Sequence, residues 1–191
     1  CDALIEAGAA IGIPRNNDIN GLDQEGIGYH QATIRNGRRC SAALAFLGPI
    51  KKRNNLDIQT GALAQKILFN GKEAIGLKYT KNGVSQMVNV RREIILSGGA
   101  FNSPQLLELS GVGQPKLLKN VGIPIVHELN GVGHELQDHQ IVRMKWRISQ
   151  SVTFNEQVHG LRALYSGLRY LFNRSGVLSM PTLPISAFTK T

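Results

Sequence analysis

Apolar and polar side chains alternate along three successive runs in the middle of the chain: Ala62–Phe69, Glu73–Tyr79 and Val84–Val90. An Asn-Gly pair stands between each run and the next. Because Asn-Gly favours the tight turns of β-hairpins, the pattern predicts a small antiparallel meander. One more strand is predicted just before it, at Leu56–Thr60.

The run after the meander has a different pattern. Glu93–Ser97 has a continuous apolar centre, which favours a strand covered on both faces, as in a parallel sheet. A helix over residues 103–110 is predicted to follow. Ser103 suits its N-cap, Pro104 its first position and Gly111 its left-handed end.

The rest of the chain predicts shorter elements. Helical periodicity predicts helices at residues 1–12, Ser41–Leu47 (ended by Gly48-Pro49), Pro115–Asn120 and His159–Phe172. Residues 19–30 are glycine-rich and predict a loop, residues 123–139 a strand and a loop, and Ile141–Ile148 a half-exposed strand. The fold class expected from this mixture is α/β (α+β), with a domain boundary near residue 140.

Composition narrows the function classes. The 191 residues carry a formal charge of +9, but their basic clusters are short and only 6% of residues are aromatic. Charged loops explain this better than a nucleic-acid surface, so we expect no nucleic-acid partner, although a basic binding module stays an alternative. No apolar run reaches membrane-spanning length, so no transmembrane segment is expected.

The two cysteines indicate the redox compartment in which the protein is expected. Cys1 and Cys40 have neither metal-ligand spacing nor a disulfide framework, which favours reduced thiols and a cytoplasmic location. Peripheral association with a membrane stays open. No metal site is expected.

Four segments resemble one protein family. They are Gly99–Gly113 (GAFNSPQLLELSGVG), Asn36–Ala43 (NGRRCSAA), Arg53–Gly61 (RNNLDIQTG) and Gly131–His139 (GVGHELQDH). Together they resemble the GMC (glucose–methanol–choline) flavoprotein oxidoreductases, in order along the chain, and most closely the choline-dehydrogenase-like branch.

The resemblance implies an FAD site. In the family the segment matching Gly98, Gly99 and Ala100 lies close to the adenosine end of FAD, and the position matching Ala64 offers its backbone N–H and C=O to the adenine. A glycine doublet suits such a contact because no Cβ intervenes. The alternatives are that the doublet only packs the following helix and that Ala64 is an ordinary strand residue.

The resemblance also implies the domain plan and the limits of the chain. Residues 1–35 correspond to a substrate-domain or lid segment, 36–139 to part of the FAD-binding domain, and 140–191 to the start of the substrate-binding domain. This is the central part of an FAD/NAD(P)-binding-type flavoprotein fold. The chain has no Gly-x-Gly-x-x-Gly fingerprint, and none of its histidines stands where the family has its catalytic histidine. We therefore expect an internal fragment without catalytic residues, inactive alone.

The implied parent reaction is oxidation of a choline-like or other alcohol by hydride transfer to flavin, with oxygen, a quinone or a dye as electron acceptor. A non-redox lyase on the same scaffold is the alternative within the family.

Overall fold

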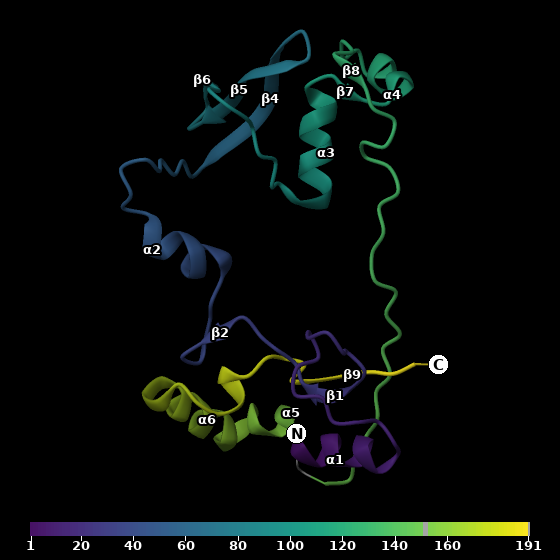
Figure 1. Ribbon diagram of the computed structural model, residues 1–191. Helices are drawn as coiled ribbons and strands as arrows, with labels where there is room; N and C mark the ends of the chain where they lie inside the picture. The colour runs from purple at the N-terminus through teal and green to yellow at the C-terminus, as the bar shows by residue number, and fades with distance from the viewer. Residues whose placement is uncertain (151–152, 191) are drawn as a thin grey trace. The chain divides into compact units, whose positions relative to one another are not determined.

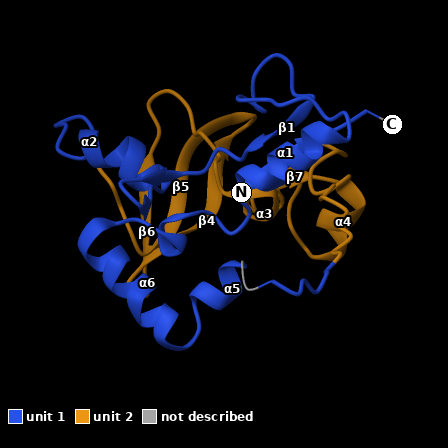
Figure 2. Cartoon of the chain, turned by 90° about the horizontal axis from the view of Figure 1, so that it is seen from below, with its two compact units in different colours: residues 1–56, 145–191 blue, residues 57–144 orange. Residues whose placement is uncertain are grey.

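Two compact units make up the chain in the computed structural model, which describes residues 1–150 and 153–190. The first unit combines residues 1–56 with 145–191, and the second comprises residues 57–144 (Figure 1; Figure 2).

The second unit contains the predicted meander. Strands β4 (Ala62–Asn70), β5 (Glu73–Lys81) and β6 (Val84–Asn89) pair antiparallel in that order. Asn82 and Gly83 both adopt left-handed backbone angles, with φ of 52° and 77°, as the favoured hairpin turn requires. The prediction of an antiparallel meander is confirmed.

Both strands predicted beside the meander are wrong. Residues 56–60 and 93–97 form no strand, and neither segment pairs with another in the part of the chain that is described. Ile95, at the centre of the second apolar run, is 76% exposed. A buried parallel strand needs neighbours on both sides, and this segment has none in the second unit.

Helix α3 (Gly99–Leu109) begins four residues before the predicted start. Ser103 therefore lies inside the helix, and its Oγ accepts a hydrogen bond from the N–H of Gly98 at 3.0 Å. Pro104 is also internal, where it removes one helical hydrogen bond. The predicted end is confirmed: Gly111 has φ of 89° and donates its N–H to the Glu108 carbonyl at 2.9 Å.

One buried serine ties α3 to the sheet. Ser110 is fully buried, and its Oγ accepts the N–H of Ile67 in β4 at 2.8 Å while donating to the Leu106 carbonyl at 2.5 Å. Next to it, β7 (Val112–Gly113) pairs parallel with β8 (His127–Glu128) across α4 (Pro115–Asn120), which confirms that predicted helix. The buried apolar side chains of this unit are Ile67, Val112, Leu118 and Val132.

The first unit begins with α1 (Asp2–Ala10), as predicted, followed by β1 (Gly26–Tyr29), which pairs antiparallel with β9 (Ile185–Phe188). The predicted loop over residues 19–30 is therefore wrong at its end. The glycines there serve close packing, because a Cβ on Gly28 would lie 1.8 Å from the carbonyl oxygen of Asn16.

Further along this unit a short hairpin joins β2 (Ile34–Arg35) to β3 (Arg38–Arg39). The helix predicted at 41–47 is a π-helix (Ala43–Leu47) that continues into α2 (Gly48–Ile50). The predicted stop at Gly48-Pro49 is wrong because Pro49 lies in the first turn of α2, where proline is tolerated.

The end of the chain carries α5 (Phe154–Gln157), α6 (Gly160–Asn173) and a 3₁₀ turn (Val177–Ser179). The helix predicted at 159–172 is confirmed by α6. The strand predicted at Ile141–Ile148 is wrong: these residues are exposed and unpaired within the described chain, so alternation alone did not specify a partner. Among residues 1–150 and 153–190, none of the helices has the length and apolar character needed to cross a bilayer.

Candidate functional site

A hollow of about 370 Å³ lies in the second unit between the start of β4 and one face of α3. We call it the β4–α3 hollow. Its apolar walls come from β4, β5, residues 94–96 and α3, and its polar groups belong to Ser97, Asn102, Ser103 and Gln105. Two predicted site residues, Ala64 and Gly98, line it together although they are far apart in sequence.

The direction of the Ala64 backbone follows from the hydrogen bonds of the meander. Ile67 gives its N–H to Ser110 and not to β5, so the pair Ile67–Leu77 is not a hydrogen-bonded pair. On β5 the carbonyl of Ile75 accepts the N–H of Val90 at 2.9 Å, which shows that this residue turns toward β6. Residues two apart in a strand face the same way, so Leu77 and Tyr79 also turn toward β6.

Ala64 is the β4 partner of Tyr79. Because Tyr79 turns away from β4, Ala64 must turn its own N–H and C=O away from β5, toward the outer edge of β4. This direction depends on the register shift between Ala64 and Lys66. Without that shift the N–H and C=O of Ala64 would point toward β5. No strand of the described chain pairs with this edge.

The two glycines at the start of α3, Gly98 and Gly99, differ in the space that surrounds them. A Cβ on Gly98 would lie 3.1 Å from the Cβ of Asn102 and 3.3 Å from the Ser103 nitrogen, so Gly98 allows close packing within the helix start. Gly99 has φ of 86°, and a Cβ there would meet nothing within 4 Å. The packing alternative therefore describes Gly98, whereas Gly99 has open space on the side where a Cβ would stand.

Ala100 lies apart from this hollow. It lines a second hollow of about 630 Å³, which α3 forms with the loop around Gly131–Leu136. Glu108 belongs to the same wall, and its carboxylate oxygen would lie 2.7 Å from a Cβ on Gly133. The structure thus brings Ala64 and Gly98 into one hollow and Ala100 into another, with Gly99 between them.

Sequence reasoning did not single out Asn102 and Gln105. Both lie on α3 and line the β4–α3 hollow, where they are its longest polar side chains. Their spacing of three residues is a helical signal. It was hidden because the helix was predicted to begin at Ser103, one residue after Asn102.

Two histidines, His30 and His139, take part in hydrogen-bond contacts with Ser and Asp residues. The Nδ1 of His30 lies 2.8 Å from the Oγ of Ser186, and Asp138 accepts the backbone N–H, not the ring, of His139. Across residues 1–150 and 153–190, no three His, Cys, Asp or Glu side chains are grouped closely enough to hold a metal ion. The expectation that the chain contains no catalytic residue stays a prediction.

Comparison with known proteins identifies the family. The family model described as "GMC oxidoreductase" matches residues 1–141. The chain belongs to the GMC oxidoreductase family. The resemblance seen in its four motifs is thereby confirmed.

The relatives of this GMC oxidoreductase chain include choline dehydrogenases. It is 40% identical over 189 residues to the human protein "Choline dehydrogenase, mitochondrial", covering 99% of this chain and 32% of that one. It is 40% identical over 192 residues to "Oxygen-dependent choline dehydrogenase" of Pseudomonas fluorescens (strain Pf0-1), covering 99% and 34%. The chain thus spans about a third of the length of the curated relatives it matches.

A solved structure agrees in fold. An FAD-dependent oxidoreductase from Chaetomium thermophilum superposes with a TM-score of 0.84 at 27% identity, covering 93% of this chain and 32% of that one. The expected fold class, mixed helix and strand with an antiparallel meander in a flavoprotein family, is confirmed. The cytoplasmic location stays a prediction, and the human relative is named as mitochondrial.

Proposed function

We propose that this chain is part of an FAD-dependent enzyme that oxidises a choline-like or other alcohol, and that the β4–α3 hollow receives the adenosine end of FAD. The observation that carries the proposal is the outward backbone of Ala64 beside Gly98, on an edge of β4 that no strand within residues 1–150 and 153–190 occupies. The choline dehydrogenases among the relatives support the substrate class.

In this proposal the chain would hold the adenosine end of the cofactor through main-chain groups and neighbouring side chains. The Ala64 carbonyl would accept from the adenine amino group, and the Ala64 N–H would donate to the adjacent ring nitrogen. Gly99, without a Cβ, leaves room for a nucleotide to approach the main chain. Asn102 and Gln105 offer further donors and acceptors on the same wall.

FAD supplies the redox chemistry when bound, accepting hydride from the alcohol carbon. Residues 36–139 would then belong to the cofactor side of the enzyme, and residues 1–35 and 140–191 to the substrate side. In this proposal the electrons pass to oxygen, a quinone or an artificial dye. The oxygen-dependent name of one relative supports oxygen as the first acceptor to assay.

Two glycines give a matched test of the cofactor site. Gly99 and Gly122 both lie in the second unit, with φ of 86° and 70°, and a Cβ on either would meet nothing within 4 Å. Gly99→Ala and Gly122→Ala therefore introduce the same kind of backbone strain, about 1 kcal/mol. Of the two, only Gly99 is a direct chain neighbour of Gly98, which lines the β4–α3 hollow.

Equilibrium dialysis with ADP measures the difference. We expect Gly99→Ala to weaken ADP binding by about tenfold, a loss of about 1.4 kcal/mol, while Gly122→Ala leaves it within twofold of the wild-type chain. Equal losses in the two variants would refute the site. The chain alone should reduce no dye in the presence of choline, and turnover would refute the expectation that catalytic groups lie outside it.

A further inference from the structure

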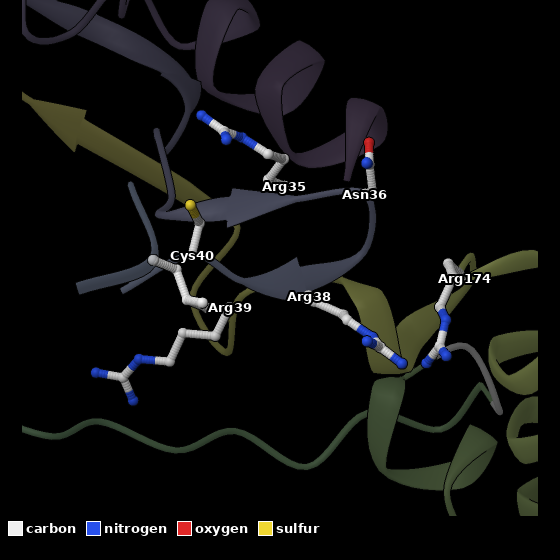
Figure 3. A pocket seen from close by; sticks show the side chains of 7 residues that line it. Arg35, Asn36, Arg38, Arg39, Cys40 and Arg174 are labelled. Atoms are coloured by element: carbon white, nitrogen blue, oxygen red, sulfur yellow. The ribbon is translucent and has the colours of Figure 1, made fainter. Parts of the chain in front are cut away.

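Four arginines surround a hollow of about 490 Å³ in the first unit, remote in sequence from the proposed cofactor site (Figure 3). Arg35, Arg38 and Arg39 come from the β2–β3 hairpin, and Arg174 follows the end of α6. In Figure 3 the guanidinium groups of Arg38 and Arg174 point toward one another, whereas Arg35 and Arg39 extend away from that pair.

Backbone packing holds Arg174 against the hairpin. Asn36 and Gly37 form its turn with φ of 51° and 67°, and a Cβ on Gly37 would lie 2.2 Å from the Arg174 carbonyl oxygen. Only glycine can occupy this position without moving the end of α6. The approach of Arg174 to Arg38 is therefore built into the main chain.

Arg174 itself adopts an unfavourable conformation. Its φ is 51°, at a helix end where glycine or asparagine is preferred, and its guanidinium lies 5.2 Å from the ring centroid of Tyr170. A left-handed backbone at a residue other than glycine carries a strain of about 1 kcal/mol or more. Such strain at an arginine that faces a hollow points to a role for its charge.

None of the residues that line the hollow is an Asp or a Glu. Residues 26–56 and 157–191, which contain every residue that lines the hollow, include no Asp and no Glu. The ion pairs found within residues 1–150 and 153–190 are Arg15–Glu6 and Lys190–Glu25, and neither involves the four arginines. Arg35 and Arg38 are moreover direct cross-strand partners, an arrangement in which like charges repel.

We propose that this hollow binds a small molecule that carries a phosphate group. Arg38 and Arg174 would donate paired N–H groups to the phosphate oxygens, while Arg35 and Arg39 add positive potential. The hollow is within the range of about 300–1,000 Å³ that is typical of small-molecule sites, so it has room for more than the phosphate. Leu44 provides an apolar side against which an organic group can pack.

Phenyl phosphate is a suitable probe, with phenol and benzoate as its uncharged and carboxylate counterparts. Binding to the full 191-residue chain is measured by isothermal titration calorimetry at constant ionic strength, because salt screens charge–charge attraction. We expect phenyl phosphate to bind at least about tenfold more tightly than benzoate, since a phosphate dianion engages two guanidiniums. Equal affinity for phenyl phosphate and benzoate would overturn the phosphate assignment.

The variant Arg38→Gln/Arg174→Asn removes both converging charges while keeping a residue at position 174 that tolerates the left-handed backbone. Its control is Arg91→Gln/Arg92→Gln, which removes the same charge from exposed positions in the second unit. We expect the first variant to bind phenyl phosphate at least about tenfold more weakly, and the control to stay within twofold of wild type. Equal weakening of both variants would mean a diffuse charge effect and would overturn the site.

Discussion

Removing the Ser110 hydroxyl tests how the β4–α3 hollow is held together. The two elements that form the hollow are joined by the hydrogen bond from the Ile67 N–H to the Ser110 Oγ, 2.8 Å long and buried. Ser110→Ala deletes the acceptor but leaves the Ile67 N–H in place. Both residues are buried, so water cannot easily take the place of the lost acceptor.

The expected magnitude follows from this burial. A buried donor left without a partner costs about 1–3 kcal/mol. The Ser110 hydroxyl also donates to the Leu106 carbonyl, but that carbonyl accepts the Ser110 N–H at 3.1 Å as well and keeps this bond in the variant. We therefore expect Ser110→Ala to lower the free energy of unfolding of the second unit by about 2 kcal/mol.

Hydrogen exchange is the appropriate assay. The single tryptophan, Trp146, belongs to the first unit, so its fluorescence does not report directly on β4. Exchange of the Ile67 amide should accelerate by about 30-fold if 2 kcal/mol is lost, because each 1.4 kcal/mol is a factor of ten in the opening equilibrium. Far-UV circular dichroism during urea unfolding gives an independent measure of the same loss.

Ser85→Ala is the control. Ser85 lies on β6, is exposed, and has no side-chain hydrogen bond in the described residues, so its loss should change stability by less than about 0.5 kcal/mol. If Ser110→Ala behaved like Ser85→Ala, the serine would not couple α3 to β4, and the account of how the hollow is assembled would be wrong.

Two further substitutions test local features of the units. Glu135 has φ of 56°, and asparagine tolerates this conformation better, so Glu135→Asn should raise the free energy of unfolding by about 0.5–1 kcal/mol in urea; a loss of stability would contradict this. The hydrogen bond from the Tyr29 hydroxyl to Asp2, 2.6 Å long, raises the pKa of Tyr29 above its ordinary value of 10.0. Any stability it contributes is present below pH 10 and is lost as pH rises through the raised pKa. Asp2→Asn should lower the Tyr29 midpoint in an NMR titration, and an unchanged midpoint would exclude Asp2 as the cause.

Local patterns predicted the parts of the fold that depend on local chemistry. Alternation and two Asn-Gly pairs were sufficient for the meander, because turn type and side-chain period are properties of neighbouring residues. The first turn lies one residue later than its Asn-Gly pair, at Gly71 and Lys72, because Asn70 still pairs with Glu73. The strand expected at 93–97 failed because a strand exists only when another segment pairs with it, and no local pattern names that partner. The start of α3 failed because Ser103 reaches back to Gly98 from inside the helix, whereas its position before a proline suggested an N-cap.

In the candidate site, too, local sequence predicted some features, whereas others depend on contacts between distant segments. Ala64 and Gly98 were selected through family motifs, and the structure places them in one hollow. The outward direction of the Ala64 backbone depends on a register shift in β4, which has no signal in the sequence. Asn102 was missed because the helix that carries it was predicted to begin at Ser103, so its helical spacing to Gln105 was not seen. The Arg38-Arg39 pair was interpreted as solvated loop charge, and Arg174 was not connected with it, because the contact between the hairpin and the end of α6 joins segments distant in sequence.

The central claim is that the exposed backbone of Ala64 recognises adenine. A ¹⁵N-resolved NMR titration of the chain with ADP, and separately with GDP, tests it most directly. Adenine presents a donor and an acceptor that match the Ala64 C=O and N–H, whereas guanine presents them in reverse at the same edge. The account predicts that ADP shifts the amide resonances of Ala64, Gly98 and Gly99 and that GDP does so far more weakly. Equal shifts with both nucleotides, or shifts confined to residues outside the β4–α3 hollow, would contradict it.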